Sequence, residues 1–192
     1  MIRGLTFTPL SESSIPRLVN AMDDPEFEPI RDDLIKMTLD HYLHNDGLAQ
    51  AAKQAESMPL TPDELKRYVE SRRIYNITEI EPIPTIEWAA SALPSKEQAG
   101  LVPNLFLDWT KLDTIAATNW LSAQEPSKIR DETIASFATK ATDIDSESAA
   151  TWALEIKDSN TRAATLNGVI EKWRQEDSSA ANQWVEKNKR SE

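Results

Sequence analysis

The amino-acid sequence predicts an all-α fold, a right-handed αα-hairpin solenoid of about five 32-residue repeats. The tryptophans carry the period, because four of the six follow one another at intervals of 32 residues and the other two lie 64 apart. The first set is Trp88, Trp120, Trp152 and Trp184, and the second is Trp109 and Trp173. The chain also holds only 4 glycines in 192 residues, a composition that favours helices over turn-rich sheets.

The first part of each repeat has the apolar pattern of a long amphipathic helix. Val102, Leu105, Phe106 and Trp109 are spaced by three, four and seven residues, so they lie on one helical face. The residues 32 and 64 positions later have the same character, except that Ala141 stands in place of a tryptophan. We expect a helix of about 16 residues, followed after a short turn by one of about 11.

The second helix of each repeat is expected to begin at an aspartate. Asp113, Asp145 and Asp177 each precede a tryptophan by seven residues. A carboxylate there accepts a backbone N–H and complements the positive end of the helix dipole, which makes these residues predicted N-caps. An alanine and the tryptophan follow three residues apart on one face, where a small and a large side chain fill the seam between packed helices.

In chain order, residues 1–25 are predicted to form an N-terminal cap on a single helical-repeat domain that spans 1–192. The five hairpins are expected at about 26–57, 61–93, 95–125, 127–157 and 159–190. The second begins with Thr61 as a cap and Pro62 at the first helical position. Asp46 aligns with Asp145 at an offset of 99 residues, three periods plus three. We therefore expect an inserted connection at 76–85, whose two prolines cannot both occupy a helix interior.

The stretches from aspartate to tryptophan at 145–152 and 177–184 resemble the helical repeats of large uncharacterised bacterial proteins with tryptophan-containing αα-hairpins. In the broad sense the chain is also similar to tetratricopeptide and HEAT-like solenoids. The resemblance extends over about 165 residues, and it implies a superhelix that serves as a protein-interaction scaffold.

Composition excludes several classes of function. The chain has 21 Lys and Arg against 32 Asp and Glu, a net charge of -11, so phosphate backbones are repelled and no nucleic-acid partner is expected. No apolar stretch approaches the roughly 20 residues of a membrane helix, and none suits a signal peptide, so we expect a soluble chain without a membrane partner. The absence of cysteine removes thiolate chemistry and leaves the compartment open, with the cytoplasm as the default.

Catalytic and metal sites have no convincing candidate in the sequence. His41 and His44, the only histidines, are three residues apart on a predicted helix, but a zinc site usually needs a third protein ligand. Paired carboxylates such as Asp32 and Asp33 resemble those of a glycosidase, yet in a helical repeat they suit caps and solvated faces. We therefore expect no catalytic residue, no metal and no cofactor.

Two sets of residues are candidates for partner binding. Arg31, Arg130 and Arg162 recur near the start of long helices, either as an exposed basic ladder for acidic peptides or as ion partners of acids in a neighbouring hairpin. Trp109 and Trp173 are expected at a rim, because Ala141 takes their place in the hairpin between them. The other tryptophans are expected in the core between hairpins, rather than along a binding groove.

These observations favour a non-catalytic helical scaffold that binds a protein or peptide along an extended concave face. A structural or regulatory segment of a larger protein is the first alternative. An enzyme domain with an acidic groove is the second. The sequence does not indicate an oligomeric state.

Overall fold

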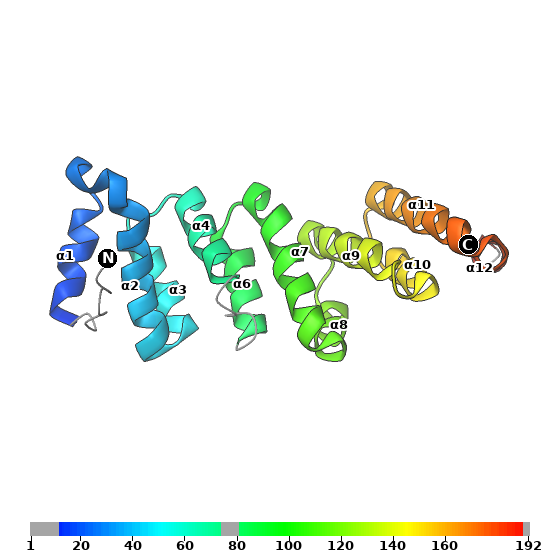
Figure 1. Ribbon diagram of the computed structural model, residues 1–192, viewed down its shortest axis with the longest axis horizontal. Coiled ribbons are helices and arrows are strands. Elements are labelled where there is room, and N and C mark those ends of the chain that lie inside the picture. The colour runs from blue at the N-terminus through cyan, green and yellow to red at the C-terminus, as the bar shows by residue number, and fades with distance from the viewer. Residues whose placement is uncertain (1–11, 74–80, 190–192) are drawn as a thin grey trace, which may run out of the picture. The chain divides into compact units, whose positions relative to one another are not determined.

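The computed structural model describes residues 12–73 and 81–189 (Figure 1). Within these two ranges every regular element is helical, with 11 α-helices and two short 3-10 helices. The expected all-α fold is therefore confirmed for the described residues. None of the described helices combines the length and the apolar character that are needed to cross a bilayer.

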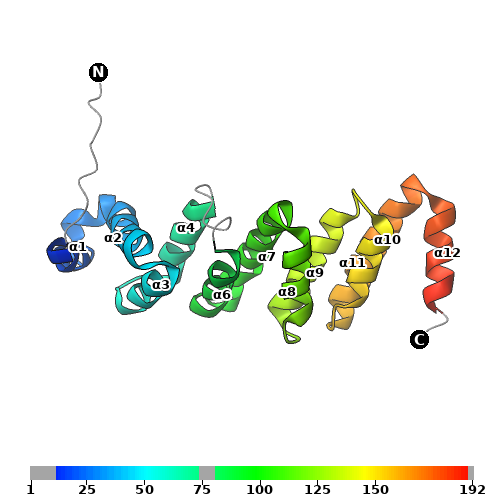
Figure 2. The same cartoon turned by 90° about the horizontal axis from the view of Figure 1, so that it is seen from below.

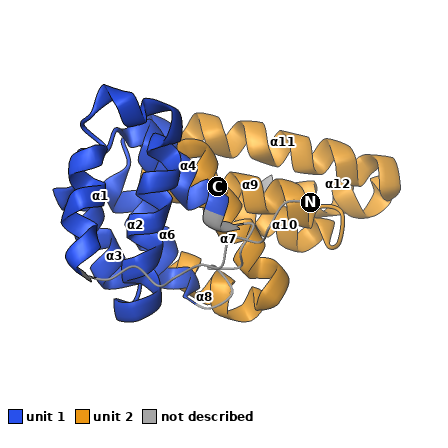
Figure 3. Cartoon of the chain, turned by 60° about the vertical axis from the view of Figure 1, so that its left-hand side comes forward, with its two compact units in different colours: residues 1–97 blue, residues 98–192 orange. Residues whose placement is uncertain are grey.

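The chain divides into two compact units, Met1–Glu97 and Gln98–Glu192 (Figure 3). In unit 1, α2 packs against α3, and α4 contacts both α2 and α6. The pairs α2–α3 and α4–α6 fall within the first two predicted hairpins, and the α2–α4 contact joins these two hairpins. The elements of unit 1 are η1 (Glu12–Ser14), α1 (Ile15–Ala21), η2 (Pro25–Ile30), α2 (Arg31–Asp46), α3 (Leu48–Ser57), α4 (Pro62–Arg73) and α6 (Pro82–Ala92).

Unit 2 holds the last three predicted pairs of helices. Its elements are α7 (Ser95–Leu112, which starts in unit 1), α8 (Thr114–Ala123), α9 (Lys128–Ala141), α10 (Ser146–Leu154), α11 (Ser159–Glu176) and α12 (Ser178–Lys189). Helices α9, α10 and α11 each contact the other two, and α11 also packs against α12 (Figure 2). The helices from α9 to α12 therefore pack on helices that are next to them or one removed in the chain.

The three predicted aspartate caps are confirmed. Asp113, Asp145 and Asp177 each accept, through Oδ1, the backbone N–H of the third residue after them, which satisfies one orphan donor of the helix that follows. The donors are Ala116, Ser148 and Ala180, at 2.9, 3.0 and 2.9 Å. These bonds fix where α8, α10 and α12 begin.

The loss of one such cap should be measurable. Asp145→Ala should lower the free energy of unfolding by roughly 0.5–2 kcal/mol, because the Ser148 N–H loses its acceptor. Glu147→Ala is the control, since Glu147 is exposed on the same turn and should change stability by less than about 0.5 kcal/mol. Denaturant unfolding measures both, and equal losses would contradict this helix start.

Two local expectations are wrong. Helix α2 continues through Asp46, and the residue that joins it to α3 is Gly47, whose φ of 83° favours glycine. Asp46 is thus not the counterpart of the Asp145 cap. Pro82 and Pro84 lie in the first turn of α6, where backbone N–H groups have no partner within the helix. The expected connection is therefore helical from residue 82 onward, and its part at 76–80 lies outside the described residues.

The core of unit 2 combines alanines with tryptophans. Ala138, Ala149, Ala150, Ala153 and Ala181 are completely buried in one cluster. The cluster also contains Trp173 and Trp184. Alanines allow the helix backbones to approach closely, while the large rings fill the remaining space. This is the pairing of small and large side chains that the sequence pattern predicts.

Candidate functional site

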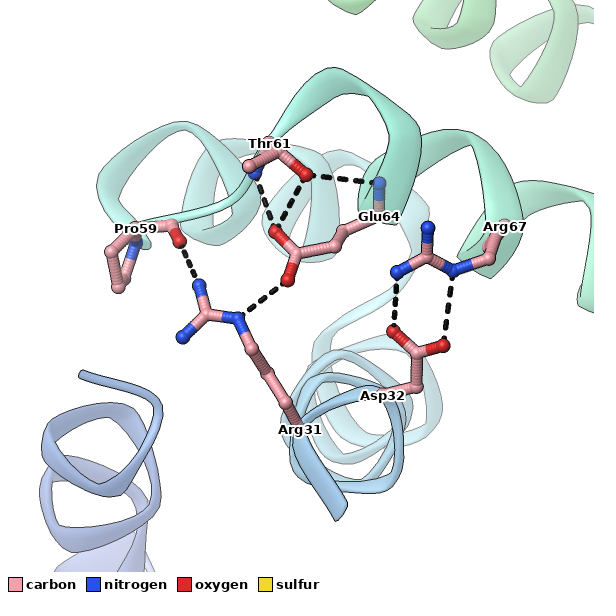
Figure 4. A network of polar contacts seen from close by, with 6 residues as sticks. All are labelled: Arg31, Asp32, Pro59, Thr61, Glu64 and Arg67. Carbon is pink, nitrogen blue, oxygen red and sulfur yellow. Dashed lines mark hydrogen bonds and ion pairs between the residues drawn. The ribbon is translucent and has the colours of Figure 1, made fainter. Parts of the chain in front are cut away.

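Arg31, the first of the predicted partner-binding arginines, is used inside unit 1 (Figure 4). Its Nε donates to Oε1 of Glu64 at 2.5 Å, and its Nη2 donates to the carbonyl oxygen of Pro59 at 2.5 Å. Glu64 belongs to the next predicted hairpin, so the alternative of an ion pair between neighbouring hairpins is confirmed here. Beside it, Arg67 forms two hydrogen bonds with Asp32, at 2.8 and 3.0 Å.

Glu64 also completes a capping box at the start of α4. Its Oε2 accepts the Thr61 N–H at 2.6 Å and the Thr61 hydroxyl at 2.8 Å, and the Glu64 N–H donates to Thr61 Oγ1 at 3.3 Å. Burial alone would raise the pKa of the Glu64 carboxyl, but the hydrogen bonds from Arg31 and Thr61 together lower it below its ordinary value.

This lowered pKa predicts an acid-sensitive contribution to stability. A carboxyl whose pKa is lower in the folded chain stabilises the fold fully above the unfolded pKa of about 4.3, and the contribution is lost as pH falls through the folded pKa. Glu64→Gln should therefore be less stable than the parent at neutral pH, with the difference shrinking below about pH 4.3. Thermal unfolding between pH 3 and 7 tests this, and a constant difference would contradict it.

The two arginines of unit 2 are also engaged with the fold. Arg130 is only 7% exposed, and its Nη1 donates to the carbonyl oxygen of Glu155 at 3.2 Å. Arg162 is half-buried, and its Nη1 donates to the carbonyl oxygen of Ile156 at 2.8 Å. These two arginines therefore form neither the exposed ladder nor, as Arg31 does, an ion pair with an acid of a neighbouring hairpin. The carbonyl oxygens of the loop between α10 and α11 have no acceptor role within a helix, and the two arginines donate hydrogen bonds to them.

Asp131 completes the attachment of this loop. Its side chain is buried, and its two carboxylate oxygens accept the N–H groups of Lys157 at 3.0 Å and Asp158 at 2.8 Å. Its Oδ1 also lies 4.0 Å from Nη1 of Arg130. Adjacent side chains at the start of α9 thus bind both the carbonyl and the amide groups of one loop.

Trp109 and Trp173 do not lie at a rim. They are 5% and 8% exposed, whereas Trp120 and Trp152 are only partly buried. Trp109 packs its ring 5.9 Å from that of Trp120, and the rings of Trp173 and Trp184 are 6.3 Å apart. The predicted division between core and rim tryptophans is therefore wrong.

The reason lies in the hairpin that has an alanine. Ala141 is accompanied by Phe137 one turn earlier, at the position that Leu105 and Val169 occupy in the other two hairpins. The Phe137 ring packs edge-on against Trp152 at 5.4 Å. The large ring has moved by one turn of the helix, and the space stays filled. The small side chain of Ala141 is thus compensated within the core by the large side chain of Phe137.

Both histidines contact groups of their own helix. The Nδ1 of His44 lies 2.7 Å from the carbonyl oxygen of Asp40, and the Nδ2 of Asn45 lies 3.2 Å from the Nδ1 of His41. Across residues 12–73 and 81–189, no group of three or more His, Cys, Asp or Glu side chains could hold a metal ion. The pair His41 and His44 is therefore engaged in contacts along its own helix.

The most exposed large apolar side chains of the described chain gather near the turns inside two hairpins of unit 2. Ile144 is 90% exposed, Ile115 75% and Leu112 53%, while no other large apolar residue described exceeds 45%. Leu112 and Ile144 lie 32 residues apart, and each directly precedes a capping aspartate. We call these three residues the turn edge.

An apolar residue at this position normally packs against the fourth helical residue, in a hydrophobic staple. For Ile144 that residue is Ala149, which is completely buried and leaves Ile144 outside. The turn edge therefore does not serve helix capping. Contiguous exposed apolar groups are a feature of interaction surfaces.

An open groove lies beside the turn edge. It is lined by Leu107 of α7, by the small residues Ala135, Ser136 and Thr139 of α9, and by Lys140, Asp143 and Lys172. Asp143, the residue before Ile144, forms ion pairs with Lys172 and with Lys140. The hydrogen bond from Lys172 lowers the pKa of the Asp143 carboxyl, so this group is charged at neutral pH.

Acidic side chains surround the turn edge. Asp113, Asp145 and Glu147 are all exposed. The pKa of Asp145 is lowered by hydrogen bonds from the Ser148 hydroxyl and N–H. Aliphatic side chains among carboxylates suit a partner that presents aliphatic and basic groups together.

No protein-family model, no curated protein and no solved structure matches this chain. The sequence nevertheless holds a signal for the turn edge, which the predicted site residues did not include. Leu112 and Ile144 obey the 32-residue period and are apolar next to a polar cap. Only the exposed fractions distinguish them from staple residues.

Proposed function

We propose that the chain is a non-catalytic scaffold that binds a protein or peptide through the turn edge and the neighbouring groove of unit 2. The observation that carries the proposal is the 90% exposure of Ile144, together with the 53% exposure of Leu112 at the equivalent position 32 residues earlier. The surrounding carboxylates support a partner segment with aliphatic and basic side chains. The engaged arginines speak against an acidic peptide bound along a basic ladder.

Site-specific crosslinking in the source cell tests this proposal. A photo-reactive phenylalanine derivative in place of Ile144 should trap a defined partner, and the same group in place of Glu186, which is exposed on α12, should not. Raising the salt concentration should reduce the trapping, because exposed charges are screened within about 8 Å at physiological ionic strength. An identical set of crosslinked proteins from both positions would overturn the proposal.

A matched pair of double variants separates the turn edge from general surface effects. Leu112→Ser with Ile144→Ser should abolish capture of the trapped partner while it leaves thermal unfolding nearly unchanged. Ile30→Ser with Ile83→Ser, at two other exposed positions, should retain the partner. If the first pair also retains it, the turn edge is not the binding surface.

We also propose that the helix pairs stack as a solenoid, in keeping with the 32-residue period. A compact chain of 192 residues should have a radius of gyration of ~16 Å. Small-angle scattering of the full chain should give a clearly larger value. A radius at or below the compact value would exclude stacking of all five pairs.

A further inference from the structure

Two of the four glycines directly follow an aspartate or an asparagine, at Asp46–Gly47 and at Asn167–Gly168. In such a pair the glycine nitrogen can attack the side-chain carbonyl carbon, Cγ, of the residue before it, because glycine has no Cβ to obstruct the approach. The product is a five-membered succinimide ring. Hydrolysis of the ring gives back aspartate in part, and otherwise gives isoaspartate, in which the backbone runs through the former side chain.

The two pairs differ in their backbone and not in their access to water. Asp46 and Asn167 are both exposed. Ring closure requires the backbone between the two residues to rotate out of the helical conformation. Gly168 lies in the middle of α11, where its N–H donates to the carbonyl four residues earlier and helical turns continue on both sides. Rotation there breaks several hydrogen bonds at once, so the helix protects Asn167.

Gly47 lies instead just beyond the end of a helix. It follows the last residue of α2, its φ is 83°, and a Cβ at this position would meet no atom within 4 Å. The backbone therefore has open space on this side. Rotation at Asp46 disturbs only the final turn of α2, and helix ends open far more easily than helix interiors.

We propose that Asp46–Gly47 is a site of spontaneous isomerisation to isoaspartate in the folded protein, whereas Asn167–Gly168 is protected from deamidation. The bond from the Gly47 nitrogen to Cγ of Asp46 forms while a C–O bond of the carboxylic acid breaks, and the hydroxyl leaves with the amide proton as water. A second water molecule then opens the ring. No oxidant, reductant or further reactant is consumed. This covalent change in unit 1 goes beyond the scaffold function.

The rearrangement acts on the packing of α3 against α2. Isoaspartate adds one methylene group to the main chain between Asp46 and Gly47. Leu48 and Ala51 follow directly on α3 and are buried, and α3 packs against α2. A longer connection shifts these side chains out of the close packing that they make in the parent. The isomerised chain should therefore be less stable than the parent.

Incubation of the full-length protein in ¹⁸O-water at neutral pH tests the proposal, with mass spectrometry of its peptides by electron-transfer fragmentation. The peptide that contains Asp46 should gain ¹⁸O and show the fragment ions of isoaspartate, while the peptide that contains Asn167 stays unchanged. In urea the order should reverse, because an asparagine loses ammonia more readily than an aspartate loses water. Absence of isoaspartate at Asp46 in the folded protein, or faster reaction at Asn167 there, would overturn the proposal.

The variant Asp46→Asn removes the difference in intrinsic reactivity, because asparagine then precedes glycine at both positions. In the folded variant, position 46 should deamidate at least about tenfold faster than position 167, since each rate follows the population of the locally open backbone. In urea the two rates should become similar. Equal rates in the folded variant would contradict protection by the helix.

The effect on packing has its own measurement. The isoaspartate form of the parent, separated by chromatography, should unfold at a lower temperature than the unmodified protein. Hydrogen exchange at the α3 amides should be faster in the isomerised form. An unchanged thermal midpoint together with unchanged exchange would overturn the inferred effect on α3.

Discussion

Trp173→Ala should lower the free energy of unfolding by about 3–5 kcal/mol, the cost of removing a large buried side chain and leaving a cavity. Trp173 is 8% exposed and belongs to the same core cluster as Val169, Ile170 and Trp184. Its ring lies 6.3 Å from that of Trp184. The alanines around it are already fully buried, so little side-chain movement is available to fill the gap.

Denaturant unfolding measures this loss. Glu171→Ala is the matched control, because Glu171 lies on the same helix, two residues away, and is exposed. It should change stability by less than about 0.5 kcal/mol. If Trp173→Ala costs no more than the control, the indole does not belong to the core of unit 2.

Asp131→Ala should cost about 3–5 kcal/mol, the range for breaking a buried charged network by removal of one partner. The substitution removes the acceptors of two backbone N–H groups, those of Lys157 and Asp158. It also leaves the buried Arg130 guanidinium, whose Nε already has no hydrogen-bond partner, without its adjacent carboxylate. The two N–H groups and the guanidinium each lose a partner in this variant.

Two further variants divide this effect into its parts. Asp131→Asn keeps an acceptor oxygen but removes the charge, so its loss should be intermediate. Glu132→Ala breaks only a surface pair with Lys128 and should cost less than about 1 kcal/mol. Chemical denaturation of the three variants gives the order of their losses in the free energy of unfolding. If Glu132→Ala costs as much as Asp131→Ala, the bonds from Asp131 to the loop do not stabilise the fold.

The helices and their starts could be predicted from the sequence because both depend on local chemistry. Asp113, Asp145 and Asp177 accept the predicted cap bonds within three residues of themselves. Thr61 likewise caps α4. Asp46 aligns with a cap but lies at the end of α2. The alignment could not predict this, because a single glycine with positive φ, Gly47, changes the register between α2 and α3.

The side-chain environments could be predicted less well, because they depend on contacts between hairpins. Ala141 predicts a surface position for its counterparts Trp109 and Trp173, whereas in the structure Phe137, one turn earlier, supplies the ring that packs against Trp152. The arginines recur in the sequence, but each of them also donates to a loop carbonyl, and such carbonyls have no sequence signature. Ile144 directly precedes a cap, where an apolar residue commonly packs as a staple, and only its exposed fraction shows that it does not pack against Ala149.

The Glu64 carboxylate has a consequence for how unit 1 opens locally. One group holds both the first turn of α4, through Thr61, and the guanidinium of Arg31 on α2. Fraying of that turn therefore releases a contact in the preceding hairpin, and loss of Arg31 loosens a helix start 30 residues away in sequence. Hydrogen exchange at the Thr61 and Glu64 amides should respond to a change at Arg31, so the two hairpins exchange as one cooperative segment.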